Sequence, residues 1–300
     1  MTMRIDLIIS KVGMWINMTR NKSIISQYGI IVCSFIILVT LLLTMSGCMK
    51  SSKDETRQEY GVFLSLDSAS MDKIAGYRTV VIDAQYFSHK DIAYLKTQGC
   101  TVYSYINIGA IENFREYYDT YSDLALGNYE NWDEEQWMDV SSNDWQKFLI
   151  SLEEELLDRG IDGFFVDNCD VYYEYPADNI FEGLTTILEH LMEYNKPVIV
   201  NGGDTYVMKF RDCCGSLKGI MTGVNQESVW SKIDFDTGKF SAQAKKDRNY
   251  FQDYIEACKS DGLDVYLLEY TTDNALKQKI EKYCTKKQFH YYISDSIELD

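Results

Sequence analysis

The sequence predicts an α/β protein with a single-domain fold of the (β/α)8, or TIM, barrel class. Three observations support this prediction. Eight short apolar runs recur along the chain, helical patterns lie between them, and the roughly 240 residues that hold these elements contain no break rich in proline or glycine. Each run is nearly continuous in hydrophobicity, which is typical of strands buried on both faces of a parallel sheet.

The predicted strands and helices alternate along the chain. The strands are residues 61–66, 79–82, 101–106, 163–166, 197–200, 219–224, 264–268 and 290–293. The clearest helix starts at a Ser141 or Ser142 cap and stops at Gly160, with an apolar stripe formed by Trp145, Phe148, Leu149, Leu152 and Leu156. The other predicted helices are residues 88–98, 178–194, 241–261 and 273–283.

A doubly wound open sheet is the alternative fold. Sheets of that kind that bind nucleotides carry a glycine-rich phosphate loop after the first strand. Where the first predicted strand ends, the sequence reads LSLDSASMD, which contains no such loop. The barrel is therefore the preferred prediction.

The first 48 residues are predicted to be an export leader. Arg20 and Lys22 precede an uncharged apolar run, residues 30–44, and the leader ends in MSGC at Cys48. The run is shorter than the roughly 20 residues of a membrane-spanning helix, and small residues before a cysteine resemble the lipobox of bacterial lipoproteins. We expect Cys48 to become the lipidated N-terminus, with an uncleaved membrane anchor as the alternative. The predicted organisation is a leader at 1–48, a polar linker at 49–58 and a barrel at 59–300.

Charge and composition argue against two classes of function. The whole chain has a net charge of -17, and without the leader 25 basic and 45 acidic residues leave about -20, which repels nucleic acid and attracts cations. The cysteines form no CxxC pair, and His89, His190 and His290 fall in different predicted elements. Neither a zinc site nor a histidine-cluster metallohydrolase is indicated. We expect no metal or organic cofactor.

Polar residues follow every predicted strand. In a barrel of this class the active site lies at the carboxyl ends of the strands, so these residues should gather on one rim. A single one can be a helix cap or a turn former, but a complete ring is harder to explain in that way. The ring consists of Asp67, Asp83, Asn107, Asp167, Asn201, Asn225 with Glu227, Glu269, and Ser294 with Asp295. Carboxyl groups without a His, Cys or Ser nucleophile pattern indicate chemistry like glycoside hydrolysis.

Glycoside hydrolysis needs one ionised carboxylate and one carboxylic acid held protonated. Asp167 is the predicted ionised partner, because a buried strand fixes its position and Asn168 and nearby amides can hold the anion. Glu227 is the predicted acid, since its longer side chain on a loop can reach the glycosidic oxygen. Asp83 and Glu269 are the alternatives for either role.

A long segment, residues 107–141, separates the third strand from its helix. It exceeds the usual loop length and carries Glu112, Arg115 and a cluster of Tyr and Trp residues. Long insertions on this rim usually shape substrate clefts. Aromatic rings near the strand ends can stack on sugar faces, although ordinary packing is the alternative for each of them.

Six segments carry a family resemblance. They are VVIDAQY, YSYINIGAIENFR, the W-x4-W-M-D-V segment from Trp132, DGFFVDNCD, VIVNGG and GVNQESVW. Together they resemble glycoside hydrolase family 114, the endo-α-1,4-polygalactosaminidases, over residues 60–300. DGFFVDN and YINIG-x2-E-x2-R are the most specific segments, whereas NGG or NQES alone is a weak signal.

The resemblance implies a barrel that cleaves α-1,4-linked galactosamine polymers of biofilm exopolysaccharides. It also implies an acidic pair, an Asp after the fourth strand and a Glu after the sixth, which correspond to Asp167 and Glu227. The positions where the family has cleft or loop residues are Asp83, Tyr105, Gly109, Glu112, Arg115, Asp170 and Asn201. We add Asn107, Asn168, Glu269 and Tyr270 to the expected substrate-binding residues.

The expected protein is therefore an extracytoplasmic, lipid-anchored glycosidase at the cell surface, whose partner is an amino-sugar polysaccharide. Two alternatives are a barrel that binds polysaccharide without cleaving it and a glycosidase for another α-linked glycan. The separation of the Asp167 and Glu227 carboxyl groups distinguishes binding from catalysis. About 5 to 5.5 Å suits a retaining enzyme, roughly 6.5 to 9.5 Å suits an inverting one, and a much larger gap favours binding alone.

Overall fold

The computed structural model describes residues 57–130 and 132–300. The predicted leader, its lipidation site Cys48 and most of the predicted linker lie outside these residues. Within the described residues, no helix is long and apolar enough to cross a membrane.

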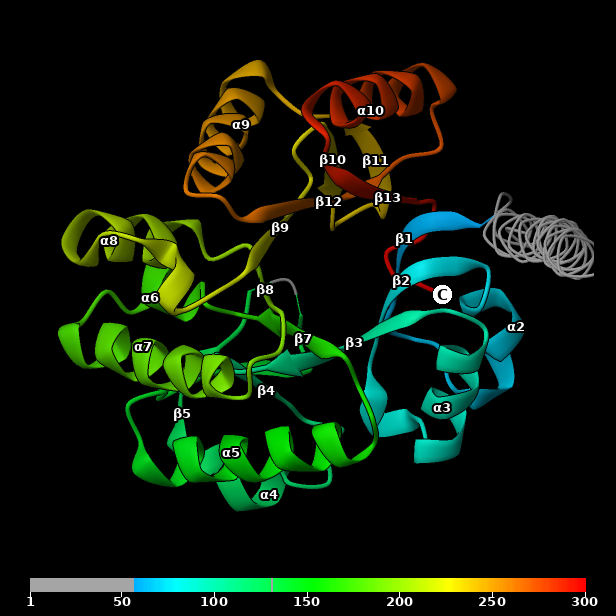
Figure 1. Cartoon of the computed structure of the whole chain (residues 1–300). Coiled ribbons are helices and arrows are strands. Elements are labelled where there is room, and N and C mark those ends of the chain that lie inside the picture. The colour runs from blue at the N-terminus through cyan, green and yellow to red at the C-terminus, as the bar shows by residue number, and fades with distance from the viewer. Residues whose placement is uncertain (1–56, 131) are drawn as a thin grey trace, which may run out of the picture. The chain divides into compact units, whose positions relative to one another are not determined.

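Eight parallel strands form the core (Figure 1). Their order is β1-β2-β3-β7-β8-β9-β12-β13, which follows the order of the chain, whereas a doubly wound sheet reverses direction at its centre. The two terminal strands of this order lie against each other, and the Phe63 and Tyr292 rings pack there with centroids 5.5 Å apart. The fold is the (β/α)8 barrel that the sequence predicts.

The barrel strands are β1 Gln58–Phe63, β2 Tyr77–Ile82, β3 Thr101–Asn107, β7 Gly163–Asp167, β8 Val198–Asn201, β9 Gly223–Glu227, β12 Asp264–Tyr270 and β13 His290–Ser294. The prediction for the sixth strand, 219–224, was wrong at both ends. Its first residue, Gly219, belongs to the short 3-10 helix Leu217–Gly219, and β9 begins only at Gly223. At the other end, β9 continues to Glu227, so this residue ends a strand and does not lie on a loop.

In residues 57–130 and 132–300, six longer helices surround the strands, as Figure 1 shows for α5, α7, α8, α9 and α10. They are α3 His89–Thr97, α5 Asn143–Asp158, α7 Asp178–Glu193, α8 Asp204–Cys214, α9 Lys245–Ser260 and α10 Asn274–Lys287. The sequence prediction missed α8 and started α9 too early, because Lys239–Ala242 forms strand β11. It also ended α10 too early, since the left-handed turn that ends this helix comes only at Gln288, whose φ is 58°. Three shorter helices are α2 Met71–Ile74, α4 Tyr118–Tyr121 and α6 Val171–Glu174.

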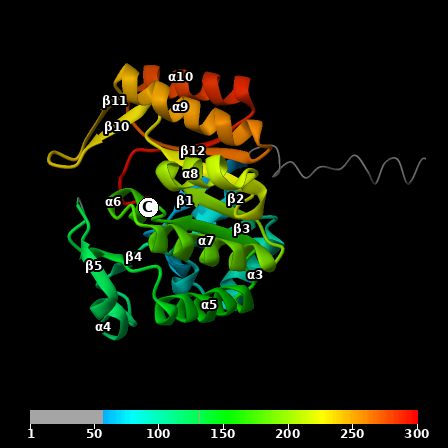
Figure 2. The ribbon, with the colours of Figure 1, turned by 90° about the vertical axis from the view of Figure 1, so that its left-hand side faces the viewer.

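Two insertions project beside the barrel rim (Figure 2). The long segment after β3 folds into a small antiparallel sheet in the order β4-β6-β5, with β4 Ala110–Glu112, β5 Ala125–Asn128 and β6 Glu135–Met138. The second insertion is the hairpin of β10 Ser231–Asp234 and β11. The two meet through Trp132 and Phe235, whose ring centroids lie 6.0 Å apart. Together they border the rim on which the polar residues gather.

Candidate active site

A large cavity of about 1200 Å³ opens at the carboxyl ends of the barrel strands. Both insertions contribute to its wall, as do residues 64–66, which follow β1 where the sequence predicted more strand. Among the described residues that line it, every charged side chain is acidic except Arg115. Ten aromatic residues also line it: Tyr86, Tyr105, Phe114, Tyr129, Trp132, Tyr173, Phe235, Tyr250, Phe251 and Tyr270. The cavity thus combines strong negative charge with flat apolar surfaces.

The two predicted acids, Asp167 and Glu227, are joined by one amide group. The Asn201 Nδ2 atom donates to Asp167 Oδ1 at 2.9 Å and to Glu227 Oε1 at 2.8 Å. Two further hydrogen bonds fix the orientation of the Asn201 side chain. Asn225 Nδ2 donates to Asn201 Oδ1 at 2.7 Å, and the Tyr60 hydroxyl donates to Asn225 Oδ1 at 3.3 Å. A polar chain inside the barrel therefore holds both carboxyl groups in place.

This shared amide limits the distance between the two acids. Both hydrogen bonds start at the same nitrogen, so the bonded oxygens of Asp167 and Glu227 are at most about 5.7 Å apart, the sum of 2.9 Å and 2.8 Å. Carboxyl groups lie about 5 to 5.5 Å apart in retaining glycosidases and roughly 6.5 to 9.5 Å apart in inverting ones. The geometry therefore favours a retaining arrangement.

Burial shapes the ionisation of the pair. Burial, and after it the negative charge of Glu227, raises the pKa of Asp167 to about 7. Interactions with Asn201, the Asn168 N–H and Tyr105 lower this pKa and only partly offset the increase. Burial also raises the pKa of Glu227, whose opposing bonds come from the Tyr270 hydroxyl, at 2.7 Å, and from Asn201. Two buried carboxyl groups this close together share one proton near neutrality.

Asp83, Glu112 and Arg115 form a buried ion-pair network in the cavity wall. The Arg115 Nη1 atom lies 2.6 Å from Asp83 Oδ2, and Nε and Nη2 bind the two Glu112 oxygens at 3.2 and 3.0 Å. The guanidinium also packs over the Phe114 ring, 5.1 Å from its centroid. Because Asp83 is committed to Arg115, the geometry gives no support to its alternative role as a catalytic acid.

A third carboxyl group near the pair, Glu135, was missed by the sequence prediction. Its Oε2 atom accepts from Asn107 Nδ2 at 3.3 Å and from Asn168 Nδ2 at 3.2 Å. The Asn168 side chain therefore binds Glu135, and only its backbone N–H reaches Asp167. Glu135 opens a strand of the inserted sheet, and no feature of the local sequence separates it from its neighbour Glu134.

The backbone around Asn168 is tightly constrained. Asn168 has a positive φ of 67°. A Cβ atom added to Gly109 would lie 1.8 Å from the Asn168 carbonyl oxygen. Only glycine fits at position 109, which explains the glycine of the INIGA segment. This close approach brings the inserted segment directly against the strand end that carries Asp167.

The predicted site residues Asp170 and Glu269 have different surroundings. Asp170 lines the cavity, where its Oδ2 atom accepts from the Gly203 N–H at 3.0 Å. Glu269 is fully buried and is not among the cavity residues; it accepts from the Trp230 and Ser231 N–H groups and from the Ser231 hydroxyl. Its expected role in catalysis or substrate binding is therefore not supported. Glu269 instead anchors the start of the β10–β11 hairpin.

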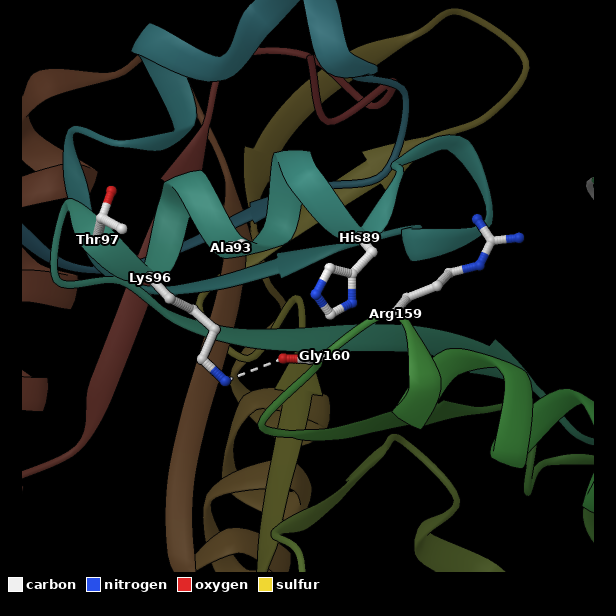
Figure 3. A pocket seen from close by; sticks show the side chains of 6 residues that line it. All are labelled: His89, Ala93, Lys96, Thr97, Arg159 and Gly160. Atoms are coloured by element: carbon white, nitrogen blue, oxygen red, sulfur yellow. Dashed lines mark hydrogen bonds between the residues drawn. The ribbon is translucent and has the colours of Figure 1, made fainter.

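A smaller hollow of about 440 Å³ lies between α3 and the turn after α5 (Figure 3). Its basic side chains already have partners. Lys96 Nζ donates to the Gly160 carbonyl at 3.0 Å and pairs with Asp162 at 2.6 Å. Arg159 donates to three carbonyls of the segment after β2 and to Glu155. These contacts tie α3 to the barrel and leave the rim as the site of interest.

The raised pKa values predict that stability falls as pH rises. Asp167 and Asp170 have pKa values of about 7, and Glu135 has one of about 8, in each case mainly because of burial. These values exceed the roughly 4 of an unfolded chain, so the stabilisation is complete below about pH 4 and is lost as pH rises through 7 to 8. We expect the unfolding midpoint in calorimetry to drop by several degrees between pH 5.5 and 8.5, and to drop less in Glu135→Gln. A midpoint that stays constant or rises would contradict this.

The model of glycoside-hydrolase family GH114 matches residues 49–297. The "Uncharacterized protein MJ1477" of Methanocaldococcus jannaschii is 25% identical over 208 residues, which cover 56% of this chain and 59% of that protein. The matched part of the chain thus spans less than two thirds of the length of this curated relative.

Two solved structures are similar in fold. The glycoside hydrolase domain of PelA from Pseudomonas aeruginosa gives a TM-score of 0.69 at 18% identity, covering 81% of this chain and 96% of that one. Aspergillus fumigatus Ega3, in complex with galactosamine, gives a TM-score of 0.61 at 17% identity, covering 82% of this chain and 92% of that one. At these identities the likeness concerns the barrel architecture.

Proposed function

This chain belongs to glycoside-hydrolase family GH114, a family of glycosidases, and we propose that it is an endo-acting hydrolase of α-1,4-linked, galactosamine-containing exopolysaccharide. The observation that carries the proposal is the pair of buried carboxyl groups, Asp167 and Glu227, that share the Asn201 amide within the cavity. A pair with this separation and one shared proton is what a retaining glycosidase requires.

The charge of the cavity supports a cationic substrate. Its described charged side chains are acidic apart from Arg115, which is neutralised by Asp83 and Glu112. A polymer of amino sugars with free amines carries positive charge at neutral pH, and a cleft of one sign concentrates the opposite charge. Ega3, which shares the fold, was crystallised with galactosamine. A neutral glycan would leave most of this negative charge without a partner.

The size of the cavity supports endo action. Its volume of about 1200 Å³ exceeds the roughly 300 to 1,000 Å³ of ordinary small-molecule pockets. Three of the aromatic residues in its lining are largely exposed, Phe114 by 57%, Tyr173 by 65% and Tyr250 by 55%. A cleft of this size and lining can hold several sugar units at once, as cleavage within a chain requires.

In the proposed mechanism, Asp167 attacks the anomeric carbon while Glu227 gives its proton to the departing glycosidic oxygen. A covalent glycosyl-Asp167 ester forms, and the leaving chain departs. Glu227, now ionised, then takes a proton from a water molecule that attacks the same carbon and releases Asp167. Tyr270 and Asn201, which bind Glu227, hold it in position for both proton transfers.

Two inversions at one carbon restore the starting configuration, so we expect the first product to be the α-anomer. Proton NMR of the reaction, recorded within minutes of mixing, checks this, because the α and β anomeric signals are resolved before mutarotation mixes them. An initial β signal would mean direct attack by water. It would remove Asp167 from the role of nucleophile.

The activity itself is tested with the soluble part of the chain, residues 50–300. It is incubated with partially deacetylated α-1,4-galactosaminogalactan, and new reducing ends are counted. Their release, with short oligomers appearing early, supports an endo-acting glycosidase. Binding without release would favour a polysaccharide-binding lipoprotein, and release only from another α-linked glycan would change the substrate.

The proposed place of action is the outside of the cytoplasmic membrane. The support is the leader pattern that ends at Cys48, with small residues before the cysteine as in a lipobox. A lipid on Cys48 would anchor the barrel to the membrane surface, where an extracellular polysaccharide is accessible. Labelling with a radioactive fatty acid in wild type and Cys48→Ala cells tests this, and equal labelling would reject it.

A further inference from the structure

Glu135 occupies a defined position beside the proposed nucleophile. Its Oε2 atom is held by the amides of Asn107 and Asn168. Asn107 is the register partner of Asp167 across the β3–β7 ladder, and Asn168 follows Asp167 in the chain. Within the described residues, the second oxygen of Glu135 has no hydrogen-bond partner, and the side chain lines the cavity. One oxygen is therefore anchored and the other is available to a ligand.

The carboxyl group of Glu135 lacks a cation among the described residues. Arg115, the one basic side chain found there in the cavity lining, is bound to Asp83 and Glu112. Burial, then the charges of Glu112 and Asp167, raises the pKa of Glu135 to about 8. A partly buried carboxylate between two others is stabilised when a cation binds beside it. The free oxygen of Glu135 is thus electrostatically suited to bind a cationic group of the substrate.

The structure of a sugar ring indicates which substituent of the substrate can lie beside Glu135. The nucleophile must reach the anomeric carbon, C1, and C2 is bonded to C1. The C2 substituent of the sugar at the cleaved bond must therefore lie beside the nucleophile. Glu135 is bound to both of the residues that flank Asp167 in the structure, Asn107 across the ladder and Asn168 along the chain. Its available oxygen is placed for a substituent on C2.

We propose that Glu135 is the specificity-determining residue that binds the C2 ammonium group of the amino sugar whose glycosidic bond is cleaved. This inference rests on the proposed function and adds to it that the enzyme distinguishes substrates by their substituent on C2. An ammonium group donates to the carboxylate and neutralises it. A C2 hydroxyl cannot neutralise it, and a C2 acetamido group is uncharged and larger. The site should therefore select deacetylated units at the point of cleavage.

The test compares two substrates that differ only at C2, an α-1,4-linked hexamer of galactosamine and the matching hexamer of galactose. For the purified full chain in detergent, we expect Glu135→Gln to lower kcat/KM on the galactosamine hexamer by roughly 10- to 100-fold. On the galactose hexamer we expect less than about a threefold change. Glutamine keeps the size of the side chain and an oxygen for Asn107 and Asn168, so the variant should fold.

The matched control is Glu130→Gln, which removes the same charge from an exposed position of the same insertion, outside the cavity lining. It should change neither value. Equal losses on both hexamers in Glu135→Gln, or no loss on either, would overturn the inference. If the wild type cleaves neither hexamer, the proposed function fails, and calorimetric binding decides the inference separately. Weaker binding of only the galactosamine hexamer in Glu135→Gln would then support it, and unchanged binding would reject it.

Discussion

Replacement of Asp167 by asparagine is expected to lower kcat on α-1,4-galactosaminogalactan by roughly 10⁴-fold or more. An amide cannot form the glycosyl ester and cannot carry the negative charge that the transition state requires. The change is nearly isosteric, and the Asn201 amide can still donate to the remaining side-chain oxygen. Polymer binding should therefore be retained. Counting new reducing ends over hours, together with a binding isotherm for the polymer, measures both effects.

The folding of this variant provides its own control. Burial raises the pKa of Asp167 to about 7, so a neutral side chain removes an unfavourable charge above that pH. The unfolding midpoint of Asp167→Asn should equal or exceed that of the wild type at pH 8. Asp212→Asn, on the exposed side of α8 and outside the cavity lining, removes one charge elsewhere and should retain full activity. Substantial turnover by a folded Asp167→Asn protein would remove Asp167 from the mechanism.

The barrel could be predicted because its signal is local. Each buried strand is a short apolar run, and strand order in a (β/α)8 barrel follows the chain. The wrong boundary of β9 has a physical reason. Asn225 and Gln226 are buried polar residues within the strand, and the Asn225 amide is satisfied by Asn201 and Tyr60 inside the barrel. A prediction based on hydrophobicity places the end of a strand where its polar residues begin, so it ended β9 too early.

The same limit explains the outcome for Glu269. By sequence it follows an apolar run as Asp167 does. In the structure β12 continues to Tyr270, and successive side chains of a strand point to opposite faces. Tyr270 reaches Glu227, so Glu269 faces the other way, under the hairpin. Glu135 could not be found because its position depends on how the inserted sheet packs on the rim, which no periodic pattern encodes.

Glu227→Gln is expected to lower kcat on the polymer by roughly 10²- to 10⁴-fold, the usual contribution of a general acid. Glutamine keeps an acceptor oxygen for the Asn201 amide, and its own amide nitrogen can donate to the Tyr270 hydroxyl oxygen, but it has no acidic proton to give to the glycosidic oxygen. The loss should depend on the leaving group. A 4-nitrophenyl α-galactosaminide departs as a stabilised anion and needs little protonation, so its first step should be nearly unaffected. A burst of nitrophenol followed by slow turnover, measured by stopped flow, is the expected result.

Asp167 and Glu227 accept hydrogen bonds from the same nitrogen, so the geometry alone hardly distinguishes the nucleophile from the acid. The dependence on the leaving group does distinguish them. A variant without its nucleophile loses the first step for every leaving group, so Asp167→Asn should release no burst. If Asp167→Asn gave the burst and Glu227→Gln did not, the two roles would be exchanged. Azide provides a second test, because it attacks the glycosyl ester without help from a base. It should speed turnover only in the variant that lacks the acid. That variant should be Glu227→Gln, because Glu227 is the residue that gives its proton to the glycosidic oxygen in the proposed mechanism.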